Sequence, residues 1–135
     1  MNSGLSDAGA RYERRGAAGF ILLDRPKALN ALTLPMVAIG ARGVISVTSN
    51  AFPAEVSRAT RLALEGTWDE ARRAHLALLP VHEAMFLEAS PAPVKAVLAM
   101  RGVMKDAVRG PIARCTEPTR KALGAVLDAY ARSQR

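Results

Sequence analysis

Residues 67–89, TWDEARRAHLALLPVHEAMFLEA, decide the fold class. Apolar side chains recur in this stretch at steps of three and four residues, the period of a helix that packs one face against a core. Thr67 and Glu70 have the spacing of a capping box, so the helix is expected to begin there, and Pro80 is expected to bend it. The stripe that should face the core consists of Trp68, Ala71, His75, Leu78, His82, Met85, Phe86 and Ala89.

Proline, serine, threonine and glycine mark further helices after Asn50. Proline suits the first turn of a helix, serine and threonine suit its N-cap, and glycine suits the position after its end. These signals predict three more helices, from Pro53 to Gly66, from Ser90 to Gly102, and from Thr116 or Thr119 onward.

The N-terminal part follows a different pattern. Residues 12–24, YERRGAAGFILLD, contain two extended halves around a glycine-containing middle, so a β-hairpin is expected. A short helix is expected over residues 30–39, with Asn30 as its cap, Pro35 in its first turn or two and Gly40 at its end. The predicted fold class is therefore mainly α with an N-terminal β-hairpin.

Residues 43–48, GVISVT, form a β-branched run without alternation. Such a run is typical of a strand that is buried on both faces of a parallel sheet. The sequence therefore predicts a strand here, although the rest of the chain offers it no obvious neighbours.

Length and charge exclude several classes. The 135 residues suit one ordinary domain and are too few for a fold of about 250 residues, such as a complete α/β barrel. The formal net charge is +7, but the basic residues are scattered with few aromatic residues among them, so no nucleic-acid partner is expected. No run reaches the roughly 18 apolar residues of a membrane span, so no membrane partner is expected.

Cys115 is the one cysteine of the chain. It cannot form an internal disulfide, and it has no cysteine or histidine partner at metal-ligand spacing, so it is expected to be a structural thiol. The N-terminus carries no apolar targeting segment. Together these features predict a cytoplasmic location.

His75 and His82 are the candidates for chemistry. Seven residues place them two turns apart on one helical face, roughly 10 Å along the axis, whereas helical metal sites use spacings of three or four. We therefore expect two packed histidines that each make a hydrogen bond, with no metal and no cofactor. Glu83 and Glu88 should lie on the wet face of the same helix.

Three strings within residues 32–132 carry a resemblance to a known family: LTLPMVAIGARGVISVTSN, LALEGTWDEARRAHLALLPVHEAMF and EASPAPVKAVLAMRGV. This stretch resembles the C-terminal third of the 4-hydroxy-tetrahydrodipicolinate synthase family. The resemblance implies that GVISVT is the eighth strand of a TIM barrel, followed by the last barrel helix and a C-terminal helical domain. It also implies a substrate-binding role for Ile45, whose backbone carbonyl would face the pyruvate-binding lysine.

Residues 12–37, YERRGAAGFILLDRPKALNALTLPMV, resemble instead the N-terminus of the enoyl-CoA hydratase/isomerase (crotonase) family. That resemblance implies a hairpin followed by a loop along coenzyme A, in which Lys27, Ala28 and Leu29 would take part. The chain would then consist of a disordered tail (1–10), a crotonase-like hairpin and loop (11–31), a last TIM-barrel strand and helix (32–66) and a helical domain (67–135).

Both resemblances imply enzymes whose machinery has no matching position in this chain. The synthase family condenses pyruvate with aspartate semialdehyde, in lysine biosynthesis, through an imine on a lysine of a strand that is missing. We therefore expect a truncated or chimeric relative that is inactive alone and binds neither pyruvate nor coenzyme A in isolation. The alternatives are a helical interaction module, which meets another copy or a homologous barrel subunit, and a coenzyme-A-binding remnant.

Overall fold

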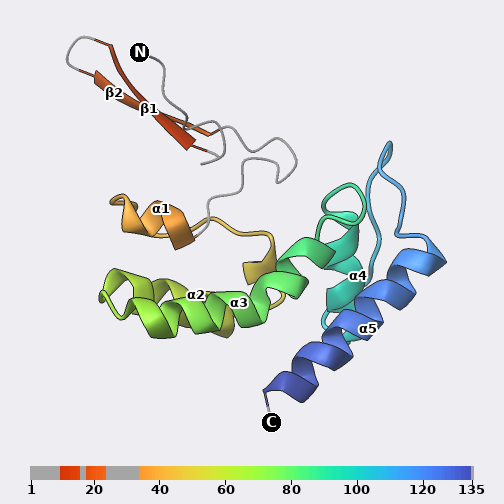
Figure 1. Ribbon diagram of the computed structural model, residues 1–135. Helices are drawn as coiled ribbons and strands as arrows, with labels where there is room; N and C mark the ends of the chain where they lie inside the picture. The colour runs from red at the N-terminus through yellow and green to blue at the C-terminus, as the bar shows by residue number, and fades with distance from the viewer. Residues whose placement is uncertain (1–9, 16–17, 24–33, 135) are drawn as a thin grey trace. The chain divides into compact units, whose positions relative to one another are not determined.

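The computed structural model describes residues 10–15, 18–23 and 34–134, and the chain divides into two compact units, Met1–Ala31 and Leu32–Arg135. In the first unit, strands β1 (Ala10–Arg15) and β2 (Ala18–Leu23) pair antiparallel (Figure 1). The predicted helix cap Asn30 and most of the predicted tail lie outside the described residues.

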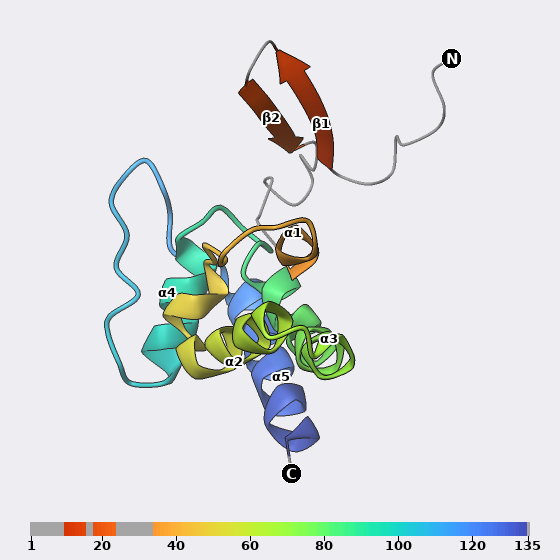
Figure 2. The ribbon, with the colours of Figure 1, turned by 90° about the vertical axis from the view of Figure 1, so that its left-hand side faces the viewer.

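The second unit is helical. Its elements are, in chain order, α1 (Leu34–Ala38), the 3₁₀ turn η2 (Thr48–Asn50), α2 (Pro53–Leu64), α3 (Trp68–Ala84), α4 (Ala92–Met100) and α5 (Glu117–Ser133). Helix α1 packs on α2, α2 lies beside α3, and α5 packs against both α3 and α4 (Figures 1 and 2). The prediction that this part of the chain is helical is confirmed.

Proline and glycine set the helix boundaries as expected. Pro53 is the first residue of α2, and Pro35 is the second residue of α1. The glycines after α1, α2 and α4 have φ angles of +105°, +80° and +71°, which residues with a side chain rarely adopt, and they are Gly40, Gly66 and Gly102. These three helices therefore end where a glycine permits the chain to reverse.

The main core lies where α4 and α5 meet the end of α3. Its largest fully buried side chains include Phe52 before α2, Met85 after α3 and Leu123 of α5. A smaller cluster joins α1 to α2 and α3 through Val37, Ala63 and Ala71. Burial of these apolar faces is the main source of stability for helices of this length, which are marginal alone.

The predicted strand over residues 43–48 is not formed, and this prediction was wrong. Residues 41–46 have no regular secondary structure, and Thr48 already belongs to η2. A strand needs hydrogen bonds from a neighbouring strand, and the described residues of the second unit contain none. The β-branched sequence therefore forms an irregular segment that leads into η2.

The predicted capping box at the start of α3 is also absent. Thr67 is the N-cap residue, but its hydroxyl makes no cap hydrogen bond and donates instead to the carbonyl of Leu62, 2.8 Å away. The backbone N–H of Thr67 donates to the same carbonyl at 2.9 Å. Thr67 therefore closes α2, because the reversal at Gly66 brings it next to an orphan carbonyl of that helix.

The end of α3 and the start of α5 complete the comparison with the predicted helix boundaries. Helix α3 includes Pro80 and ends at Ala84, so the predicted stripe residues Met85, Phe86 and Ala89 lie beyond its end. Of the two candidate starts of the last helix, Thr116 is the N-cap residue of α5. Its backbone N–H and hydroxyl both donate to the Glu88 carboxylate, at 3.1 and 2.6 Å. Glu88 therefore stabilises the N-terminus of α5 through these hydrogen bonds. It lies beyond the end of α3 and is not part of the solvent-exposed face of that helix.

Candidate functional site

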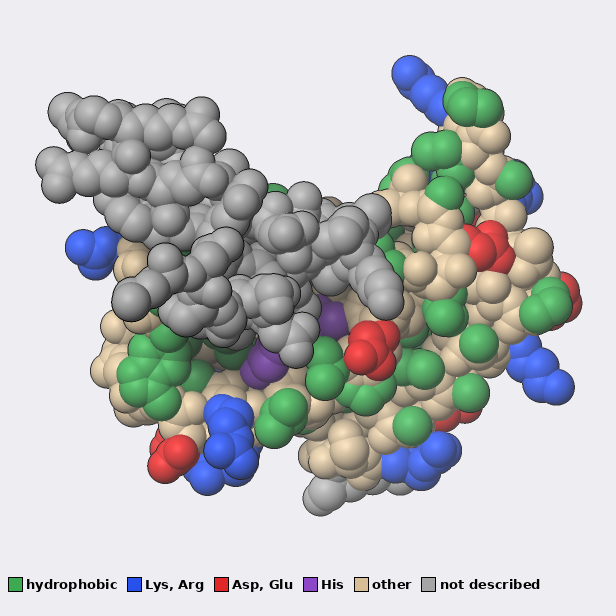
Figure 3. All heavy atoms as spheres, turned by 45° about the horizontal axis from the view of Figure 1, so that its top comes forward, with side chains coloured by type: hydrophobic (Ala, Val, Ile, Leu, Met, Phe, Trp, Pro, Cys, Tyr) green, Lys and Arg blue, Asp and Glu red, His purple; other side chains and the backbone are tan. Residues whose placement is uncertain are grey.

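His82 and Thr48 form the most specific polar contact of the second unit. The Nδ1 atom of His82, on α3, lies 2.8 Å from the hydroxyl of Thr48, the first residue of η2. Thr48 is only 1% exposed, so its hydroxyl needs a partner inside the protein. The ring centroid of His75 lies 5.6 Å from that of His82. Histidine, in purple, reaches the surface on the face seen in Figure 3.

The environment of His82 keeps its imidazole neutral. Burial, and to a lesser extent the charge of His75, lower the pKa of His82 from 6.5 to about 4. At neutral pH the ring therefore carries no charge. Its Nδ1 atom and the Thr48 hydroxyl form one hydrogen bond. The buried Thr48 hydroxyl is out of reach of a substrate, so this pair holds η2 against α3 and does not form a nucleophile and base.

The predicted role of the histidines is confirmed for His82, which packs and makes a hydrogen bond. The side chains of the pair lie closer together than the spacing along the helix axis suggested. Within the described residues, no group of three histidine, cysteine or acidic side chains could hold a metal ion. Thr48 was missed as the partner, although its place at the end of the apolar run GVISVT was the available signal.

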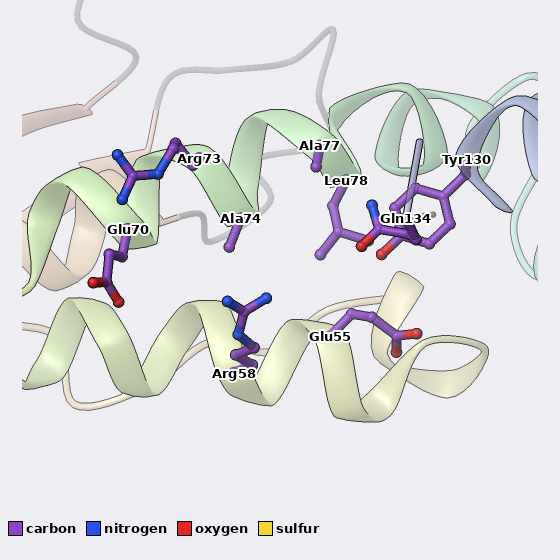
Figure 4. A pocket seen from close by; sticks show the side chains of 9 residues that line it. All are labelled: Glu55, Arg58, Glu70, Arg73, Ala74, Ala77, Leu78, Tyr130 and Gln134. Carbon is purple, nitrogen blue, oxygen red and sulfur yellow. The ribbon is translucent and has the colours of Figure 1, made fainter. Parts of the chain in front are cut away.

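A cleft of about 450 Å³ lies between α2 and α3 and reaches the end of α5 (Figure 4). Arg58 rises from α2 and Glu70 descends from α3 into the space between the two helices. The remaining lining residues are Glu55, Arg73, Ala74, Ala77, Leu78, Tyr130 and Gln134. The cleft thus mixes acidic and basic side chains, and no lysine, cysteine, serine or histidine is among the described residues that line it.

Tyr130 joins this cleft to the core. Its ring meets that of Phe52 edge to face, with centroids 5.5 Å apart. Burial, and then the charge of Glu55, raise the pKa of the Tyr130 phenol. The phenol is therefore protonated at neutral pH and is not a candidate general base.

Cys115 is a structural thiol, as the sequence predicts. It is 9% exposed and belongs to the main core. Burial and the neighbouring Glu88 carboxylate raise the pKa of the thiol, so the reactive thiolate is disfavoured.

Of the residues named by resemblance, the structure describes only Ile45. Ile45 lies in the segment without regular secondary structure between α1 and η2, and the residue is 85% exposed. Lys27, Ala28 and Leu29 lie outside the described residues.

None of the helices that the structure describes has the length and apolar character of a membrane span.

Comparison with known proteins finds one family. The sequence model of the Dihydrodipicolinate synthetase family matches residues 26–130. The 4-hydroxy-tetrahydrodipicolinate synthase of Sorangium cellulosum is 54% identical over 92 residues, which cover 68% of this chain and 31% of the relative. The family match includes residues 27–29, and the resemblance of the N-terminal segment to crotonases finds no support in these comparisons.

Solved structures give the same result. The dihydrodipicolinate synthase of Aquifex aeolicus is 40% identical, with a TM-score of 0.71, over 74% of this chain and 34% of that one. The enzyme of Acinetobacter baumannii, in complex with pyruvate, is 28% identical with a TM-score of 0.70 over 73% and 34%. The chain therefore spans about a third of the length of these relatives.

Proposed function

Since the chain belongs to the Dihydrodipicolinate synthetase family, we propose that it is a partial 4-hydroxy-tetrahydrodipicolinate synthase that has no catalytic activity alone. It would correspond to the last strand and helix of the barrel together with the helical domain. In this proposal the chain is cytoplasmic, and its role depends on a polypeptide that supplies the rest of the barrel.

The surroundings of the lysines carry this proposal. Imine chemistry needs a lysine whose amine is desolvated and neutral. In the described part of the chain, Lys105 and Lys121 are exposed, and Lys95 donates to the backbone carbonyl of Ala107. None of the three lines the cleft between α2 and α3.

Ile45 keeps the substrate-binding role implied by the resemblance as part of this proposal. That role belongs to its backbone carbonyl, which would act only when a sheet forms around residues 43–48. The exposed position of Ile45 in the isolated chain is consistent with a site that is incomplete.

Borohydride trapping with pyruvate tests the proposed inactivity. The chain and the Sorangium cellulosum relative are each incubated with pyruvate and reduced, and their intact masses are measured. We expect the relative to gain the mass of a reduced pyruvate adduct and the chain to remain unchanged. A stable adduct on any lysine of the chain would show that it performs the first covalent step alone.

The second candidate is a helical interaction module that associates with another copy of itself. It is favoured by large apolar side chains on the surface, of which Ile45 and Val103 are the most exposed at 85% and 68%. Analytical ultracentrifugation distinguishes this candidate, because a monomer at micromolar concentration excludes obligatory self-association.

The third candidate is a chimeric chain whose Lys27, Ala28 and Leu29 contact coenzyme A. Its one support is the division of the chain into two units between Ala31 and Leu32, which is the boundary expected between the crotonase-like segment and the barrel remnant. Titration calorimetry with coenzyme A tests it, and the absence of heat at millimolar ligand would remove it.

A further inference from the structure

We propose that α3 pairs with α3 of a second copy of this chain, antiparallel and about a two-fold axis between Leu76 and Leu79. The surface that pairs is the α3 stripe, which consists of Arg72, Leu76, Leu79 and Glu83. This inference rests on the second candidate function, self-association, and adds to it a surface and a geometry. It does not depend on the proposed lack of catalysis, which borohydride trapping tests separately.

The α3 stripe occupies one face of its helix. Its members follow one another at steps of four, three and four residues, which places them next to one another on a helical surface. The buried residues of α3 are a different set, Ala71, Leu78, Val81 and Ala84. The α3 stripe is therefore a second face of the helix, distinct from the face that builds the core.

Two leucines form the centre of the α3 stripe, and both are exposed. Leu76 is 50% exposed and Leu79 is 37% exposed. A single exposed leucine is ordinary on a protein surface, but apolar neighbours on one helical face form a seam along which helices associate. Covering both leucines would remove apolar area from water, and this would stabilise a complex.

Opposite charges flank the two leucines. Arg72 lies one turn before Leu76, and Glu83 lies one turn after Leu79. Both charged residues are exposed, and in the part of the chain that the structure describes neither takes part in an ion pair. Each charge is thus available to a partner molecule.

The pattern of the α3 stripe is complementary to itself when the helix direction is reversed. Arg72 and Glu83 lie equally far in sequence from the midpoint between the two leucines. In a two-fold pair, every contact between two different residues occurs twice. An antiparallel α3 pair therefore sets Leu76 against Leu79 of the partner subunit, and Arg72 against Glu83 of the partner subunit, twice each.

The charges also select the direction of pairing. A parallel pair would set Arg72 and Glu83 each against the same residue of the other copy, and like charges repel. The contact is confined to one face of one helix, so its area is small. We therefore expect a reversible dimer, since small interfaces belong to transient complexes.

Charge reversal tests the pairing. Arg72→Glu would bring carboxylates together at both ends of the pair, and Glu83→Arg would bring guanidinium groups together there. Each variant alone should associate at least roughly tenfold more weakly than the wild type. An equimolar mixture restores both pairs of opposite charges, so it should associate as heterodimers nearly to the extent of the wild type. Sedimentation equilibrium from micromolar to submillimolar concentration measures these associations.

Net charge does not explain this expected result. The chain has a formal net charge of +7, which Arg72→Glu lowers and Glu83→Arg raises, so a general charge effect would change association in opposite directions. Arg132→Glu, at an exposed position near the end of α5, is the control and should leave association unchanged. A monomeric wild type at submillimolar concentration, or a mixture that associates no better than its components, would overturn the proposal.

A second pair of variants tests the apolar centre of the α3 stripe. Leu76→Gln keeps a residue that favours helices but removes apolar area, so it should weaken association by roughly tenfold. Val103→Gln is the control, because Val103 is 68% exposed in the loop between α4 and α5. Circular dichroism checks that every variant keeps its helices. Equal association of Leu76→Gln and Val103→Gln would show that the copies meet through another surface.

Discussion

The contact between His82 and Thr48 makes the second unit sensitive to acid. It forms with a neutral imidazole whose pKa is about 4 in the folded chain and 6.5 ordinarily. As the pH falls, the unfolded state takes up the proton first. The free energy of unfolding should therefore be fully retained above about pH 6.5 and decrease down to about pH 4.

Between about pH 6.5 and pH 4, we expect the free energy of unfolding to decrease by ~1–2 kcal/mol more in the wild type than in His82→Gln. This figure is smaller than the full pKa shift implies, because solvent screens a half-buried site. Urea denaturation at several pH values measures the difference. Glu88, whose pKa is lowered by its bonds to Thr116, also loses stabilising contacts on acidification, but it does so in both proteins. Equal pH dependence of the two proteins would contradict the role of His82.

Thr48→Val tests the hydroxyl directly. Valine has the shape of threonine but leaves the His82 ring nitrogen without its partner, so a loss of ~1–3 kcal/mol is expected. Thr60→Val is the control, because the Thr60 hydroxyl bonds only to the Val56 carbonyl of its own helix. Chemical denaturation of both variants gives the comparison, and equal losses would show that the Thr48 contact contributes nothing specific.

The turn between α2 and α3 depends on backbone conformation more than on side-chain space. Gly66 has a φ of +80°, and a Cβ atom added there would meet no atom within 4 Å. Thr67 closes α2 from the next position. The end of α2 is thus stabilised by the left-handed backbone of Gly66 and by the hydrogen bond from the Thr67 hydroxyl.

Gly66→Ala should therefore destabilise the chain by about 1 kcal/mol, the cost of a left-handed alanine. Gly124→Ala is the matched control, because that glycine lies within α5 and also has open space around it. There alanine should stabilise by roughly 0.5–1 kcal/mol, since it favours the helix. Thermal denaturation measures both effects, and a change of the same sign in both variants would refute the conformational argument.

The helices could be predicted because their signals are local. Pro53 and Gly66 act through their own backbone angles, so the sequence alone placed α2 correctly. Thr67 could not be assigned correctly, because two helix ends compete for its hydroxyl. Whether residues 43–48 form a strand, and which residue bonds to His82, depend on partners distant in sequence, which periodicity does not reveal.

At the scale of the whole molecule, the chain divides into two compact units, Met1–Ala31 and Leu32–Arg135. The second unit, Leu32–Arg135, contains both hydrophobic clusters and all five helices of the described residues. Its stability should therefore not depend on the first unit.

A shortened chain that begins at Leu32 should keep the unfolding temperature of the full chain to within a few degrees, as expected for a stability difference below about 0.5 kcal/mol. Circular dichroism at 222 nm follows the helices in both proteins. Loss of the cooperative transition in the shortened chain would show that the first unit contributes to the folded state.

Arg101, at the end of α4, has a consequence for the order of folding. Its guanidinium donates to the carbonyl of Ala51 and lies 4.2 Å from the centroid of the Phe52 ring. These partners are 50 residues away in sequence, whereas α2 and α3 meet across a short turn. Because loop closure is slow for distant contacts, α2 and α3 should associate first and Arg101 last. Arg101→Met should then mainly accelerate unfolding and hardly change the refolding rate, which stopped-flow fluorescence can measure.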